Sequence, residues 1–158
     1  MLLLDVASSY ADLMTTVFSA PVLAKVWFAT VAFLLVAVQL LTAARMWGHV
    51  RKVVPLSDAT AKKVHRWSGR LALLFTLPVI FHCVFILGFR STDARVLIHS
   101  IAGSFIYGAF AAKVLFIRHH SYGRSWGLPV LGGTVAVLLV LLWVTSSGWY
   151  FTKFGVSS

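Results

Sequence analysis

Two stretches decide the fold of this chain: residues 65–82, HRWSGRLALLFTLPVIFH, and residues 99–120, HSIAGSFIYGAFAAKVLFIRHH. Both are apolar with histidine at each end, and only one of the six histidines, His49, lies elsewhere. As α-helices they would separate their terminal histidines by about 25 Å and about 31 Å. These lengths are close to the thickness of a bilayer core. The sequence therefore predicts two membrane-spanning helices with histidines near both surfaces.

The composition of the whole chain indicates a membrane protein. Of its 158 residues, 59% are hydrophobic and only 11% are charged, which excludes an ordinary soluble domain. Fourteen Lys and Arg oppose four acidic residues, for a net charge of +10. In a soluble protein this excess would suggest nucleic-acid binding, but the cytoplasmic loops of membrane proteins also collect Lys and Arg. We therefore expect contact with lipid and no nucleic-acid partner.

Four apolar runs are long enough to cross a bilayer. They predict an all-α integral membrane four-helix bundle, with spans at residues 22–44, 67–89, 96–117 and 127–151. Residues 1–19 lack the basic start of a secretory signal and contain two aspartates, which predicts an amphipathic helix at the membrane interface. We expect one membrane domain over residues 1–158, with a kink in the second span at Pro78.

Basic residues gather after the first and third spans, which predicts that these two segments are cytoplasmic. They are Arg45, Arg51, Lys52, Lys62, Lys63, Arg66, Arg70, Arg118 and Arg124. With four spans, both termini then lie on the outer side of the cell membrane.

The histidines within the spans are candidate ligands, because ionisable side chains there are costly and usually functional. If the two helices run antiparallel, His82 meets His99 near the outer surface, and His65 meets His120 near the inner surface. A period of 3.5 residues places both histidines of each helix on one face. At the inner surface two alternatives are open, His119 in place of His120 and His49 in place of His65.

Haem fits this pattern better than other metal groups do. Haem iron can be held by two axial histidines while its apolar ring lies between helices. Zinc sites need three or four ligands, and the sequence has no H-E-x-x-H motif and no acidic cluster. The single cysteine, Cys83, and the lack of a C-x-x-C-H motif exclude thioether attachment. The sequence predicts two b-type haems as cofactors.

Glycine follows histidine by four residues in both segments, at Gly69 and Gly103. A missing side chain there would let a flat macrocycle approach the backbone, although small residues also serve ordinary helix packing. Arg66 and Arg70 are candidate partners for inner haem propionates, or membrane anchors. Lys113, inside the third span, either extends towards the inner surface or neutralises an inner propionate.

With these residues the chain resembles the four-helix membrane cytochromes b, including the quinol-oxidising and ferric-reductase-like groups. The resemblance covers roughly residues 60–122 and rests on two neighbouring helices with histidines near opposite faces. The two histidines of one helix are farther apart here than is usual in those groups. This departure from the pattern bears most on the inner pair of ligands.

The resemblance implies transmembrane electron transfer through two haems, between an outer redox partner and quinone or an inner donor. No nucleotide or flavin motif is present, so we expect a subunit of a respiratory or redox complex rather than a complete enzyme. Its expected partners are other redox subunits, an outer electron-transfer protein and quinone. The alternative is a cofactor-free membrane assembly or transport protein with buried structural histidines.

Overall fold

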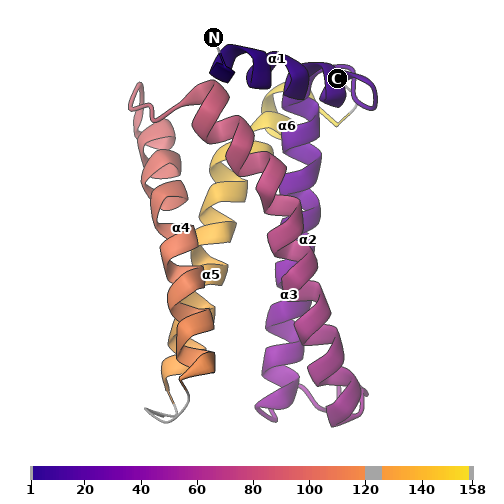
Figure 1. Ribbon diagram of the computed structural model, residues 1–158. Coiled ribbons are helices and arrows are strands. Elements are labelled where there is room, and N and C mark those ends of the chain that lie inside the picture. Colours follow the sequence, from indigo (N-terminus) through magenta and orange to yellow (C-terminus); the bar gives the residue numbers. More distant parts are fainter. Residues whose placement is uncertain (1, 120–125, 157–158) are drawn as a thin grey trace. The chain divides into compact units, whose positions relative to one another are not determined.

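The computed structural model describes residues 2–119 and 126–156, and over these residues its regular structure is entirely helical (Figure 1). Four helices are long and apolar enough to cross a membrane: Pro21–Met46, Asp58–Leu87, Ala94–Arg118 and Gly127–Phe154, of 26, 30, 25 and 28 residues. The predicted all-α class with four spanning helices is confirmed. The chain is a multi-pass membrane protein.

The helices form two units, Met1–Gly88 and Phe89–Ser158. The first unit contains α1 (Leu2–Thr15), α2 (Pro21–Met46), α3 (Asp58–Phe81) and the π-helical segment η1 (His82–Leu87). The second contains α4 (Ala94–Arg118), α5 (Gly127–Trp143), the π-helical segment η3 (Val144–Gly148) and α6 (Trp149–Phe154).

In the first unit α2 and α3 pack as an antiparallel pair. Successive contacts move towards the start of α2 as they move towards the end of α3. They are Arg45 with Asp58, Thr42 with His65, Gln39 with Ser68, and Phe28 with Phe75. The polar contacts lie near the connecting loop and the aromatic contact lies farther along the pair.

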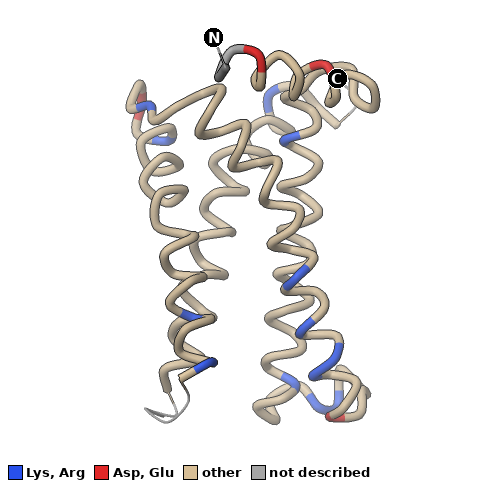
Figure 2. Tube along the Cα trace, viewed as in Figure 1, with Lys and Arg blue, Asp and Glu red and all other residues tan. Residues whose placement is uncertain are grey.

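A buried arginine holds the loop between α2 and α3. Arg45 is 8% exposed, and its guanidinium donates to the carbonyls of Val54 and Leu56 and pairs with Asp58 at 2.9 Å. Gly48 turns the chain out of α2 with φ of 90°, a value that glycine adopts without steric cost. Figure 2 shows Lys and Arg concentrated at this loop end of the α2–α3 pair.

The helices extend beyond the apolar runs from which their spans were predicted. The second begins at Asp58, not near residue 67, because the Ser57 hydroxyl accepts from the backbone N–H of Thr60 at 3.1 Å and caps three polar turns. Asp93 caps α4 in the same way. Hydropathy detects only the apolar part of each helix.

In the second span, a π-helical segment follows the proline at which a kink was predicted. Pro78 lies inside α3, and the helix becomes π-helical at His82, four residues later. A π-helical turn is a local feature that often occurs at functional sites. Gly88, with φ of 68°, ends it.

The N-terminal helix α1 lies across the end of the α2–α3 pair (Figure 1). The Tyr10 hydroxyl donates to the carbonyl of Pro78 at 3.3 Å, and its ring lies 4.8 Å from that of Phe81. Burial, with a smaller effect of Cys83, raises the pKa of Tyr10, so the phenol stays a hydrogen-bond donor at neutral pH. The location of α1 at the membrane interface stays a prediction.

In the second unit α4 packs antiparallel to α5 and η3. The Arg95 guanidinium donates to the carbonyl of Thr145 at 2.7 Å and lies over the ring of Trp149 at 4.1 Å. At the other end of the pair, Gly127 faces the ring of Phe116 so closely that any side chain there would collide with it. These contacts fix the register between α4 and the last span.

Candidate functional site

His99 of α4 is held by a threonine of the neighbouring helix. Its Nδ1 lies 2.9 Å from the hydroxyl oxygen of Thr145 in η3. That hydroxyl donates its one hydrogen to the carbonyl of Leu141 at 2.6 Å, so towards the imidazole it acts as an acceptor. This arrangement favours the His99 tautomer that carries its proton on Nδ1.

His65 of α3 has the same arrangement in the other unit. Its Nδ1 lies 3.0 Å from the hydroxyl oxygen of Thr42 in α2. Thr42 is 3% exposed and donates to the carbonyl of Val38 at 2.7 Å. The contact again favours the tautomer that carries its proton on Nδ1.

This repeated contact is the geometry that metal-bound histidines use. Such histidines usually donate their second ring N–H to a fixed acceptor, which selects the tautomer and orients the ring. Sequence reasoning missed Thr42 and Thr145, because each contacts a histidine on a different helix. A hydroxyl residue within an apolar span, near the depth of a histidine, is the signal that could have indicated them.

His82 is buried differently. It is 6% exposed, and its Nδ1 has no hydrogen-bond partner within the part of the chain that the structure describes. The ring of Tyr10 lies 5.9 Å away. An unsatisfied buried polar atom costs about 1–3 kcal/mol. This unpartnered nitrogen keeps His82 a candidate ligand.

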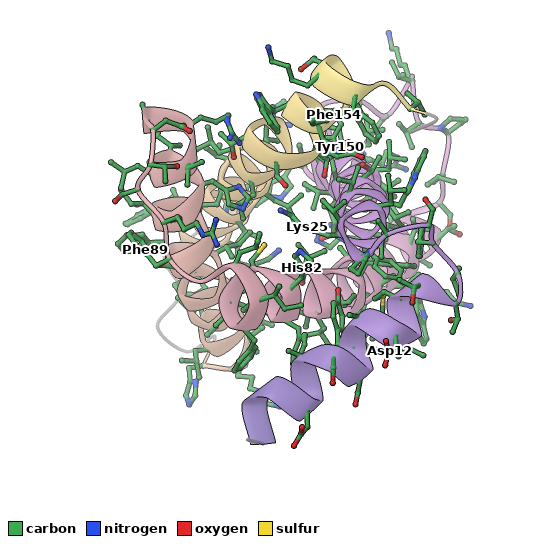
Figure 3. All side chains as sticks on the ribbon, turned by 90° about the horizontal axis from the view of Figure 1, so that it is seen from above. Asp12, Lys25, His82, Phe89, Tyr150 and Phe154 are labelled. Carbon is green, nitrogen blue, oxygen red and sulfur yellow. The ribbon has the colours of Figure 1, made fainter. Side chains whose placement is uncertain are left out.

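A buried lysine accompanies His82. Lys25 of α2 is 9% exposed, and its charge acts on His82 and Cys83. Figure 3 shows Lys25 and His82 next to each other when the molecule is viewed from above. Sequence reasoning did not select Lys25, because a lysine near the start of the predicted span 22–44 is typical of a residue at the membrane interface.

The histidines of the inner surface are placed only in part. His120 lies outside the described residues. His119 follows the last residue of α4, is exposed, and donates from Nδ1 to the carbonyl of Leu115 at 3.1 Å. His49 is exposed in the loop after α2. The choice among these alternatives stays a prediction.

The two glycines lie against neighbouring helices of their own units. A Cβ at Gly69 would come within 3.1 Å of the side-chain nitrogen of Gln39, and one at Gly103 would lie 3.8 Å from Leu142. The Gln39 amide also donates to the Ser68 hydroxyl at 2.7 Å. These contacts favour the helix-packing interpretation, most clearly at Gly69.

The cationic candidates are at the surface or only partly buried. Arg66 and Arg70 are exposed on α3, with the Arg70 guanidinium 5.2 Å from the ring of Trp67. Lys113 is half-buried on α4. All three lie in the half of their helix that is nearer the predicted cytoplasmic loop.

Each predicted ligand pair takes one histidine from each unit. His65 and His82 belong to the first unit, and His99 and His119 to the second. Within residues 2–119 and 126–156, no group of three or more His, Cys, Asp or Glu side chains could hold a metal ion. The pairing of these histidines as haem ligands stays a prediction.

Residues 6–158 match one protein family, described as a family of unknown function (DUF6529). The chain belongs to this family. Comparison with curated proteins and with solved structures gave no match.

Proposed function

We propose that this chain is a b-type cytochrome of the plasma membrane, with two haems that carry electrons across the bilayer. It acts as a subunit of a respiratory or redox complex. Electrons pass between an outer redox partner and quinone or an inner donor. Both termini lie on the outer side, and the basic α2–α3 loop lies in the cytoplasm, by the bias of such loops towards Lys and Arg.

The observation that carries the proposal is the matched histidine–threonine contact. His65 and His99 occur in different units, yet each donates from Nδ1 to a threonine hydroxyl at 3.0 Å and 2.9 Å. Both hydroxyls are fixed as acceptors by their own bonds to helix carbonyls. Metal-bound histidines use the same contact, in which one ring N–H is donated to a fixed acceptor that orients the ring.

The remaining donor set also suits haem. His82 is buried with an unpartnered nitrogen, and we assign it to the outer haem with His99. His65 belongs to the inner haem with His120, or with His119 as the alternative. Two neutral imidazoles satisfy the axial positions of haem iron.

Haem and the residues of the chain have separate roles in this proposal. Haem, when bound, supplies a one-electron iron couple. Thr42 and Thr145 hold the ligand rings in one tautomer and one orientation. The histidine pairs would hold the haem iron and would leave no open position for oxygen, which suits electron transfer.

The test is an absorption spectrum of the full chain purified in detergent from a haem-replete host, together with a pyridine haemochrome assay per polypeptide. Bis-histidine haem gives a sharp α band on reduction, and we expect two haems per chain. Folded, helical protein without haem would contradict the proposal. It would favour a cofactor-free assembly or transport protein, in which the same histidines are structural.

A further inference from the structure

Lys25 is a buried cation without a partner in the described chain. It is 9% exposed, and within residues 2–119 and 126–156 it makes no ion pair and no hydrogen bond. Its Nζ is not among the enclosed side-chain atoms, because Nδ1 of His82 is the one such atom without a partner in the described chain. The stem of Lys25 is thus buried while its ammonium group lies where an anionic group of a bound molecule can reach it.

The chain does not supply that anion from its acidic side chains. It has only four acidic residues. Asp58 pairs with Arg45, and Asp93 caps α4 and lies 3.9 Å from Arg95. The other two, Asp5 and Asp12, are in α1 and make no ion pair with Lys25. An anionic group of a bound molecule is therefore a candidate partner of Lys25.

The neighbour of Lys25 indicates which molecule this is. Its charge acts on His82, whose buried Nδ1 is itself unpartnered, and the two side chains are adjacent in Figure 3. A cation and an imidazole that both lack partners at one buried position are complementary to a ligand with a metal centre and an anionic group. Haem has both features: its iron is the metal centre, and its two carboxylates are the anionic groups.

We propose that Lys25 binds a carboxylate of the haem that His82 holds, and thereby fixes the orientation of this haem. The inference rests on the proposed function. It adds a binding residue on α2, outside the two histidine-bearing helices. A charge-assisted hydrogen bond from an ammonium group to a carboxylate is stronger than a neutral one.

The experiment compares haem with haem dimethyl ester, in which both carboxylates are blocked. Apoprotein of the full chain is reconstituted with each, and the rate of haem loss to an excess of apomyoglobin is measured. In the wild type we expect the ester to be lost faster than haem. Lys25→Met should accelerate loss of haem from the outer site by about 10- to 150-fold, with little effect on the ester.

Three variants serve as controls. Lys25→Arg keeps the charge and should stay within a few-fold of the wild type. Lys153→Met removes an exposed lysine of α6 and should change neither rate. If Lys25→Met does not fold, Lys25→Gln replaces it, and the ester comparison in the wild type still tests whether a haem carboxylate is bound.

The results separate this inference from the proposed function. A wild type without haem contradicts the proposed function itself. A wild type that binds haem and ester equally, or a Lys25→Met variant with wild-type preference for haem, overturns the assignment of Lys25 alone. An effect of Lys25→Met that requires anionic phospholipid in the micelle and ignores esterification also overturns it, because the partner is then a lipid phosphate.

Discussion

Replacing Thr145 with valine should weaken the binding of the outer haem, while both histidine ligands are retained. Valine has nearly the shape of threonine but lacks the oxygen that accepts from His99 Nδ1 at 2.9 Å. The imidazole then loses the bond that holds its tautomer and orientation. Loss of such a supporting contact typically reduces metal affinity about 10- to 100-fold, which corresponds to about 1.4–2.8 kcal/mol.

The midpoint potential provides a second readout that simple unfolding would not move in a defined direction. Donation from Nδ1 to the hydroxyl raises the basicity of the ligand and so stabilises ferric iron. Thr145→Val should therefore raise the midpoint of the outer haem. Redox titration in detergent and transfer of haem to apomyoglobin measure the two effects on the same preparation.

Two variants make this prediction specific. Thr145→Ser keeps the acceptor and should restore both affinity and midpoint. Thr134→Val removes a threonine of α5 whose hydroxyl also donates to a helix carbonyl, that of Val130 at 2.9 Å, and it should have no effect. The reasoning is refuted if Thr145→Val keeps wild-type affinity and midpoint, or if Thr145→Ser behaves like Thr145→Val.

Three further predictions concern the remaining candidates. Cys83→Ser should retain the full haem content, because the thiol is not a ligand; loss of haem with the fold intact would be incompatible with this role. Lys113→Met should lower the midpoint of the inner haem, since removing a nearby positive charge disfavours the added electron, and an unshifted redox titration would exclude Lys113 as a neighbour of that haem. His120→Ala should remove one haem while His119→Ala retains both, as counted by pyridine haemochrome; the reverse result would assign the inner ligand to His119.

The fold was predictable where a single helix carries its own signal. Lipid as the outer solvent requires long apolar runs, and many large side chains remain exposed on them, such as Leu34, Leu74 and Phe105. The polar first turns of α3 were missed, because a serine cap and not hydropathy decides where that helix begins.

Of the candidate site, only the histidines could be selected from the sequence, because the spacing of histidines along one helix is visible there. Thr42 and Thr145 became visible only when neighbouring helices were set in register, and η3 adds a π-helical turn that a constant period does not anticipate. Lys25 required knowledge of burial, because a lysine near the end of a span is usually at the interface.

The most direct test of the account is whether His82 and His99 bind one iron. The haem content per polypeptide is to be measured for the wild type, His82→Ala, His99→Ala and the double variant, with retained helicity checked by circular dichroism. The account predicts two haems in the wild type and one in each of the three variants, since the second substitution removes a ligand of a haem already lost. A double variant that has lost both haems, or a single variant that keeps both, would contradict it.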